Sequence, residues 1–223
     1  MLRIVSLLAL LSVAVGTTSE PTVSPTDIPT KMPSDDDDSA DCFSAVDTVQ
    51  VEVGGVKQIS DVRIGDRVLS YSYAAKDFVY STVVAVPHEP NSITASFIRI
   101  ATNNKEIKMT PGHLIFAGSC GRDGELVSAS QVKTGQCVKT IDGEEEVMTV
   151  DKLSAKGIYT VITNEEYVVV SGFVASPYAI SHTLGNLYYN VHRALFYVSP
   201  NLVKSQLFQS VSLSLAEMVR QFS

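Results

Sequence analysis

Cys42 and the segment Thr110-Pro111-Gly112-His113 carry the side chains of this sequence that are best suited to covalent chemistry. Cys42 stands where a tract that cannot build a core gives way to a sequence patterned for folding. A thiol at such a boundary can attack the carbonyl of the preceding residue, Asp41, and convert the Asp41–Cys42 amide into a thioester. The substrate predicted by this placement is the chain's own backbone, with the N-terminal segment as the acyl partner.

An N-to-S acyl shift must overcome the resonance of a planar amide. The fold has to hold the sulfur near the carbonyl carbon, stabilise the oxyanion and protonate the departing amine. His113 is the best candidate proton donor, because imidazole titrates near neutrality. Thr110, three residues earlier, can hydrogen-bond the same peptide. Taken alone, a Thr-x-x-His spacing is equally compatible with an ordinary loop histidine.

The beginning of the chain is patterned for export. Residues 1–16 predict a signal peptide, with Arg3 as the basic start, an apolar run over 4–15 and a small-x-small cleavage site at 14–16. That run is too short to span a bilayer and no later run is long enough, so we expect no transmembrane span. The sequence therefore predicts a secreted, extracellular protein.

Residues 17–41 combine proline at nearly every fourth position with threonine, serine and four adjacent aspartates at 35–38. Proline blocks helix and sheet, and the carboxylates repel one another, so we expect this segment to be disordered. Roughly 180 residues remain, enough for one domain with a substantial core. The net charge of −7 comes without a basic patch. We therefore expect no nucleic-acid partner, and no motif indicates a cofactor or a metal.

Three cysteines in a secreted chain are an odd number, so at least one is expected to stay reduced or to pair outside the chain. Cys120 and Cys137 can form a disulfide across a short loop, worth roughly 3 kcal/mol in the loop-entropy description. Equally, Cys137 can be a small buried hydrophobic residue. Under either alternative, Cys42 is the candidate reactive thiol.

The elements that must position these residues are β-strands. Short β-branched and aromatic runs separated by turn residues extend from Thr48 to about Tyr178, without a long helical pattern. The clearest runs cover residues 49–53, 78–86, 97–100, 146–150 and 167–170. This pattern predicts an all-β domain.

One segment of the predicted β domain recurs. Residues 60–68 and 130–138 share Ser, Val, a basic residue, Gly and Val at the same offsets, 70 positions apart. The same displacement carries Cys42 to Gly112, next to His113. If the similarity is not a coincidence of two turn-plus-strand segments, the domain has two related halves. A pseudo-two-fold axis would then bring the thiol and the imidazole together.

Residues 181–223 have a different pattern, with apolar residues at helical spacing. Ser199-Pro200 is typical of an N-cap followed by a first helical residue, which divides the tail into two amphipathic helices. These helices can pack on the β domain or on each other, or they can face a lipid or sterol. The two apolar stripes are Leu184, Leu187, Tyr188, Val191, Leu195, Val198 and Val203, Leu207, Val211, Leu215, Met218, Phe222.

Five short motifs follow one another along the predicted β domain. They are Cys-Phe-Ser at 42–44, Asp-Val-Arg-Ile-Gly-Asp-Arg-Val-Leu at 61–69, Thr-Pro-Gly-His-Leu-Ile-Phe at 110–116, Ala-Ser-Gln-Val-Lys-Thr-Gly-Gln at 129–136 and Val-Ala-Ser-Pro-Tyr-Ala at 174–179. In this order they resemble the Hint (Hedgehog/intein) domain in its Hedgehog C-terminal, or Hog, autoprocessing form, over about residues 42–180. The resemblance implies a compact, pseudo-two-fold all-β fold and intramolecular thioester formation, with Cys42 as the nucleophile and Thr110 and His113 as the Thr-x-x-His pair.

Three departures from the Hedgehog pattern limit what the resemblance implies. Asp41 replaces the glycine that precedes the cysteine, and Pro177 replaces the cysteine of the Ser-Cys-Tyr-Ala motif. His88 falls where Hedgehog proteins use an aspartate to activate the sterol hydroxyl. A histidine there can act as a base on an alcohol or water, or it can be an ordinary loop residue. The partner that resolves the thioester is thus water or another nucleophile, a sterol among them.

Intein-type splicing is not favoured, since the sequence lacks a His-Asn ending followed by a nucleophile. Self-cleavage at Asp41–Cys42 is the first hypothesis. An inactive extracellular binding or structural module on a flexible stalk is the alternative. A Cys-His peptidase acting on other chains is a third, but the sequence shows no third group to orient the histidine.

Overall fold

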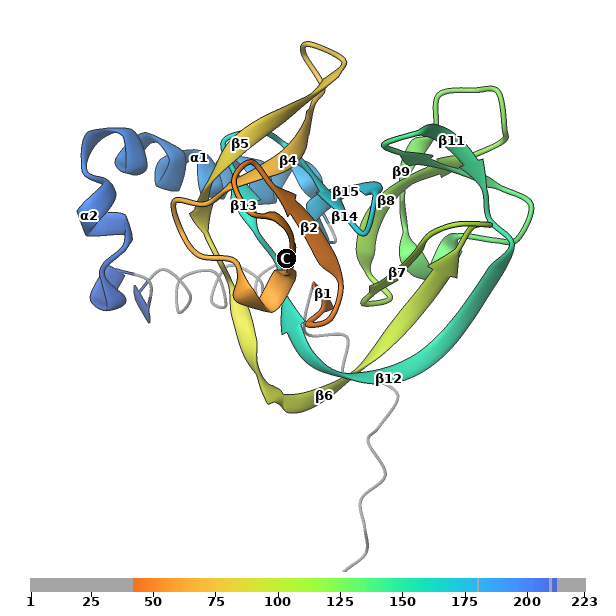
Figure 1. The fold of residues 1–223 in the computed structure, drawn as a ribbon, viewed down its shortest axis with the longest axis horizontal. Coiled ribbons are helices and arrows are strands. Elements are labelled where there is room, and N and C mark those ends of the chain that lie inside the picture. Colours follow the sequence, from red (N-terminus) through yellow and green to blue (C-terminus); the bar gives the residue numbers. More distant parts are fainter. Residues whose placement is uncertain (1–41, 180, 209, 212–223) are drawn as a thin grey trace, which may run out of the picture. The chain divides into compact units, whose positions relative to one another are not determined.

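A computed structural model describes residues 42–179, 181–208 and 210–211, without the side chains of residues 88–93 and 179. The described chain is mostly β-strand, followed by helix, which confirms the predicted fold class (Figure 1). The strands are β1 Phe43–Ser44, β2 Thr48–Val51, β3 Gly55–Gln58, β4 Arg67–Ser72, β5 Asp77–Ala85, β6 His88–Ala101, β7 Glu106–Met109, β8 His113–Gly118, β9 Glu125–Ser128, β10 Cys137–Thr140, β11 Gly143–Glu146, β12 Thr149–Tyr159, β13 Ile162–Thr163, β14 Tyr167–Val170 and β15 Phe173–Ala179. Two short 3-10 helices, Ile59–Asp61 and Ala129–Gln131, precede β4 and β10, and the helices α1 His182–Val198 and α2 Pro200–Val203 follow β15.

The strands form two sheets that curl around a shared core. β1, β12, β6 and β7 close a small barrel, in which β6 and β12 form the long antiparallel ribbon seen in Figure 1. The second sheet has the order β11-β10-β8-β15-β14-β4-β2-β3, with β5 added to β4 and β9 added to β8. Chain segments far apart in sequence are therefore neighbours, and the two-residue strand β1 lies between β12 and β7.

The sequence repeat is also a structural repeat. In the first copy, the amide of Gly65 donates to the carbonyl of Val83 and the amide of Asp66 donates to that of Arg63, at 2.9 and 3.0 Å. In the second copy, Gly135 donates to Val147 and Gln136 to Lys133, at 2.9 and 3.1 Å. Both glycines have positive φ, 100° and 85°, a conformation that favours glycine. Matching turns 70 positions apart support two related halves rather than a coincidence.

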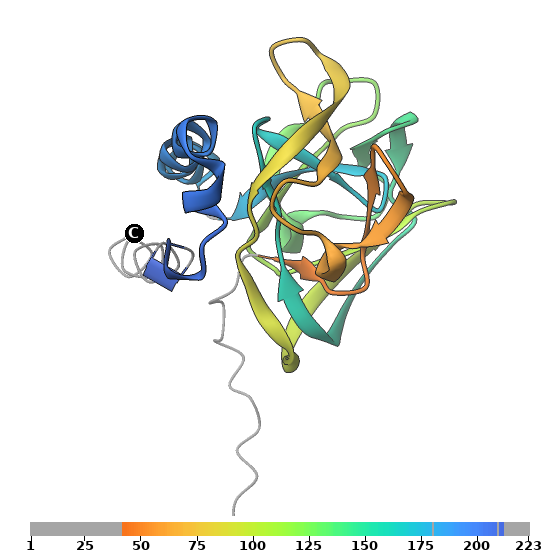
Figure 2. The ribbon, with the colours of Figure 1, turned by 60° about the vertical axis from the view of Figure 1, so that its left-hand side comes forward.

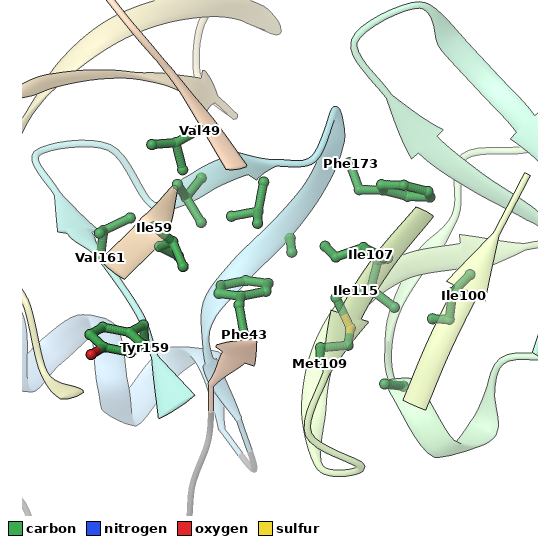
Figure 3. Packing of buried hydrophobic residues seen from close by; sticks show 14 of the residues in the cluster. Phe43, Val49, Ile59, Ile100, Ile107, Met109, Ile115, Tyr159, Val161 and Phe173 are labelled. Carbon is green, nitrogen blue, oxygen red and sulfur yellow. The ribbon is translucent and has the colours of Figure 1, made fainter. Parts of the chain in front are cut away.

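The largest apolar cluster runs between the sheets and includes the residue that follows the thiol (Figure 3). Phe43 is fully buried among side chains such as Met109, Ile115 and Tyr159. Burying a side chain of this size contributes about 1.5–3 kcal/mol. That burial anchors β1, although a strand of two residues makes few backbone hydrogen bonds.

One predicted strand corresponds to parts of two observed strands. The run over 146–150 is divided, because β11 ends at Glu146 and β12 begins at Thr149. Between them, the amide of Val147 donates to the carbonyl of Gln136 at 2.8 Å, and that of Met148 donates to Ala101 at 2.8 Å. The chain passes from one sheet to the other here, and Val147 is fully buried at the crossing point. An unbroken β-branched pattern therefore covers two strands in different sheets.

The tail begins with α1, whose N-cap is Ser181; its hydroxyl accepts a hydrogen bond from the amide of Leu184. Ser199 takes the N-cap position of α2 and Pro200 the first helical position, but the Ser199 side chain makes no capping bond. The expected single second helix is interrupted after four residues. Ser205 accounts for the break, because its hydroxyl donates to the carbonyl of Leu202 and accepts from the amide of Phe208. Residues 212–223 lie outside the described residues.

The helix α1 lies beside the strands of the β domain (Figure 2), and Arg193 fastens it there. Its guanidinium donates to the carbonyls of Thr163 and Glu165, at 2.7 and 3.1 Å, and to the hydroxyl of Tyr178 at 3.2 Å. Gly185 allows the close approach, since a methyl group there would meet the Tyr178 ring at 2.5 Å. Within the described residues, no helix is both long and apolar enough to cross a membrane.

Candidate active site

Cys42 and Thr110 are joined by a reciprocal pair of hydrogen bonds. The amide of Cys42 donates to the side-chain oxygen of Thr110 at 3.0 Å, and the amide of Thr110 donates to the carbonyl of Cys42 at 2.9 Å. Just beyond, Phe43 pairs with Met109 on β7 and with Tyr159 on β12. The nitrogen of the Asp41–Cys42 peptide is therefore fixed from the Cys42 side in a buried position.

The turn that follows Thr110 places His113 in the same region. The amide of His113 donates to the carbonyl of Thr110 at 3.0 Å, and Pro111 restricts the backbone between them. The imidazole is fully buried, and its ring centroid lies 4.2 Å from that of Phe43. Thr110 thus contacts Cys42, and His113 contacts Phe43, the residue that follows Cys42. This is expected for two residues that share one turn.

The hydrogen bonding of His113 defines its tautomer. Its Nε2 lies 2.7 Å from the carbonyl oxygen of Ser176, which can only accept, so Nε2 carries a hydrogen. In the neutral imidazole, Nδ1 then has the lone pair and is the atom that can take up a proton and pass it on. Ser176 belongs to β15, which pairs with β8. Sequence reasoning missed this partner, although Ser176 stands inside one of the recognised motifs.

The surroundings of Cys42 are mostly apolar. The residue is 8% exposed and packs with Phe97 and Ile158. Tyr189 of α1 lies close enough for the Cys42 charge to raise its pKa further, although burial is the main cause of that rise. The disulfide joins Cys120 to Cys137, so Cys42 is left with its thiol. Cys42 is thus largely shielded from bulk water.

Asp47 is a further buried polar residue near the nucleophile, and no sequence pattern singled it out. It is 3% exposed, and its carboxylate accepts hydrogen bonds from the amide of Lys108 at 3.2 Å and from the hydroxyl of Ser171 at 3.1 Å. Burial raises the pKa of Asp47 to about 7, against the opposing effect of the Lys108 charge and the hydrogen bonds. Asp47 thereby links the turn after β1 to β7 and to the β14–β15 turn.

The remaining predicted residues have different placements. His88 begins β6 and its backbone pairs with Tyr159 of β12, which pairs with Phe43 of β1 on its other side. Two strand spacings, about 10 Å, therefore separate the backbone of His88 from that of Phe43. The His88 side chain, and Asp41 with the rest of residues 1–41, lie outside the described residues. Cys120 follows the far end of β8 from His113, about 20 Å along the strand direction. The disulfide is thus remote from the Cys42–Thr110–His113 group.

No cluster of three or more His, Cys, Asp or Glu side chains that could hold a metal occurs among the described residues. The arrangement does contain a thiol at the start of the folded chain, an acceptor for its amide and an imidazole on the acceptor's own turn. These groups are chemically suited to act on the peptide bond through which the chain enters the β domain.

The chain belongs to the Hint family: the family model described as "Hint module" matches residues 31–215. It is 36% identical to Warthog protein 6 of Caenorhabditis elegans over 144 residues, which are 60% of this chain and 24% of that protein. It is 32% identical to the Sonic hedgehog protein of Xenopus laevis over 161 residues, which are 67% of this chain and 36% of that protein. The chain therefore spans about a quarter to a third of the length of these relatives.

Solved structures show the same fold at low sequence identity. A bacterial intein-like domain from Clostridium thermocellum superposes with a TM-score of 0.53 at 16% identity, covering 62% of this chain and 99% of that domain. The Ssp DnaB mini-intein variant M86 gives 0.54 at 10% identity, covering 64% and 97%. The fold and the hedgehog relatives together support an autoprocessing domain of the Hedgehog C-terminal type.

Proposed function

We propose that this domain cleaves its own chain between Asp41 and Cys42 through a thioester. The observation that carries the proposal is the hydrogen bond from the Cys42 amide to Thr110, on the turn that also places His113. That bond holds the nitrogen of the bond to be broken, and β1 is paired on both sides, which restrains it further. Preorganisation of this kind is the main requirement for an acyl shift within one chain.

The steps use only groups of this chain. Nδ1 of His113 takes the thiol proton, and the Cys42 sulfur adds to the carbonyl carbon of Asp41. The tetrahedral intermediate then expels the Cys42 nitrogen, which receives the proton from the imidazolium. A carbon–sulfur bond forms, the carbon–nitrogen bond breaks, and Cys42 acquires a primary amine. The Nε2–H bond to Ser176 keeps the imidazole in the tautomer that can perform both transfers.

Resolution of the thioester is the second step. Attack by water gives the main-chain α-carboxylate of Asp41 and restores the thiol. Attack by an alcohol, such as a sterol, gives an ester of the same main-chain carbonyl and also restores the thiol. We assign His88 as the base for the attacking hydroxyl, because its backbone is in register with Phe43 across β12. This cleavage separates the segment that ends at Asp41 from the β domain.

The mass of the expressed protein tests the proposal. We expect a break between Asp41 and Cys42 that dithiothreitol or hydroxylamine accelerates, because both attack thioesters. Cys42→Ala should abolish it, and His113→Ala should abolish the acyl shift while the fold is retained. His88→Ala should slow resolution without affecting thioester formation. Cleavage of Cys42→Ala at the same bond would disprove the mechanism, and cleavage of added peptides by the wild type would favour a peptidase instead.

A further inference from the structure

We propose that His182, the first residue of α1, is a positioning residue for the acyl shift and acts on His113 through Ser176. This inference rests on the proposed function and adds a role for the helical tail in its first step. Hydrogen-bond contacts connect His113, Ser176 and His182 in one line. The Ser176 carbonyl accepts from Nε2 of His113 at 2.7 Å, and the Ser176 hydroxyl lies 2.9 Å from Nδ1 of His182.

The hydrogen bonds of Ser176, together with the position of Glu166, give the direction that we infer for this line. The Ser176 hydroxyl oxygen accepts from the amide of Tyr178 at 3.0 Å and can donate its own hydrogen to Nδ1 of His182, which leaves the His182 hydrogen on Nε2, the nitrogen that faces Glu166. Ser176 is fully buried, and both bonds restrain its side chain. Because the hydroxyl and the carbonyl belong to the same residue, holding the side chain also holds the peptide that orients His113. This connection transmits position and does not conduct protons, since the carbonyl has no proton to pass on.

His182 is itself held firmly. Its ring stacks on Tyr167 with a centroid distance of 4.6 Å and an interplanar angle of 6°, and its centroid lies 5.4 Å from that of Tyr178. Its Nε2 lies 3.9 Å from Glu166, whose other oxygen accepts from the Asn186 amide group at 3.0 Å. With Nδ1 accepting from Ser176, the hydrogen of the neutral ring is on Nε2, toward Glu166.

Burial of the His182 ring favours its neutral, accepting form over the charge of Glu166. Burial is the largest influence and lowers the pKa of His182; Arg193 lowers it further, and Glu166 opposes both. The same Arg193 fastens α1 to the carbonyls of Thr163 and Glu165. Docking of α1 therefore delivers the acceptor that fixes Ser176, and the active site is complete only with the start of the tail in place.

Two replacements of His182 distinguish the effect of its hydrogen-bond acceptor from the effect of its size. His182→Phe keeps an aromatic ring for Tyr167 but removes the acceptor, whereas His182→Asn supplies a carbonyl oxygen in place of Nδ1. In the full chain with excess hydroxylamine, we expect thioester formation in the Phe variant to slow about tenfold, the rate equivalent of one lost hydrogen bond. The Asn variant should stay within about threefold of the wild type. The pH–rate profile should shift for Phe only.

Equal rates for the Phe variant and the wild type, or equal slowing of Phe and Asn, would overturn the proposal. A second measurement does not require cleavage. In a Cys42→Ala background, nitrogen chemical shifts of labelled histidine report the His113 tautomer. That tautomer should be Nε2–H both in the parent and after His182→Asn, and it should be altered by His182→Phe. If the wild type fails to cleave, the proposed function falls, while an unchanged His113 tautomer in the Phe variant is what refutes the positioning role.

Discussion

Replacing Asp47 by Asn is expected to stabilise the protein at neutral and alkaline pH and to leave it nearly unchanged in acid. Asp47 has a carboxylate buried under the turn after β1, where hydrogen bonds from the Lys108 amide and the Ser171 hydroxyl only partly replace the lost water. Burial raises its pKa from 3.8 to about 7. A shift of about 3 pKa units corresponds to about 4 kcal/mol of unfavourable ionisation in the folded state.

The direction follows from proton binding. Between about pH 4 and pH 7 the folded protein keeps the Asp47 proton that the unfolded chain has lost, so unfolding releases a proton. Stability contributed by this residue therefore falls as pH rises through that window, and the full penalty is present above about pH 7. Asn resembles the protonated acid in shape, can accept from the Lys108 amide and can donate to Ser171, but it never ionises.

Urea unfolding at three pH values, about 4.5, 6 and 8, measures the effect, in a Cys42→Ala background so that cleavage does not interfere. We expect the Asn variant to exceed its parent by up to about 4 kcal/mol at about pH 8 and by only about 1 kcal/mol at about pH 4.5. Asp123→Asn, which removes an exposed carboxylate, is the matched control and should show no such pH dependence. A stability difference for Asp47→Asn that is the same at all three pH values would refute the reasoning.

Two further variants probe the site and the tail. Thr110→Val leaves the buried Cys42 amide without its acceptor and should slow thioester formation about 10- to 100-fold. Thr110→Ser keeps the hydroxyl and should retain most of the rate. Equal rates for the two variants would argue against a role for the hydrogen bond. Gly185→Ala should lower the stability by about 1–3 kcal/mol and expose α1 to protease, because the new methyl overlaps Tyr178. Thr183→Ala on the exposed face should do neither, and a stabilised Gly185→Ala would show that helix propensity outweighs the contact.

The parts of the site that the sequence could predict are those carried by short motifs. Cys42 is marked by the change in composition before it, and Thr110 and His113 share one turn, so their mutual placement is a local property. The repeat predicted the two halves, because each copy contains the glycine that its turn requires. Hydrophobic periodicity could not show that the chain passes from one sheet to the other at Val147. A buried β-branched residue gives the same sequence pattern whether it lies within a strand or between two strands.

The supporting residues could not be predicted for a different reason. Asp47, Ser176 and His182 acquire their roles from partners in other strands and in α1. Ser176 lies within a recognised motif, but the motif does not show which residues its carbonyl and hydroxyl contact, and no local pattern distinguishes Asp47 or His182 from ordinary polar residues. The break in the second tail helix has a local cause, the hydrogen bonds that the Ser205 hydroxyl makes within one turn. It could not be predicted, because the apolar residues keep their helical spacing on both sides of Ser205 and that spacing favours a continuous helix.

The separation of the site residues along the chain determines when the chemistry can begin. Cys42 and Thr110 are 68 positions apart, and His113 and Ser176 are 63 apart, so β1, β8 and β15 must all be in place before the thiol, the amide acceptor and the oriented imidazole coexist. An unfolded chain has the thiol but not the preorganisation that an acyl shift requires. The proposed cleavage is therefore coupled to completion of the β domain, and through His182 to docking of α1, so that release of the segment before Cys42 would report that the whole domain has folded.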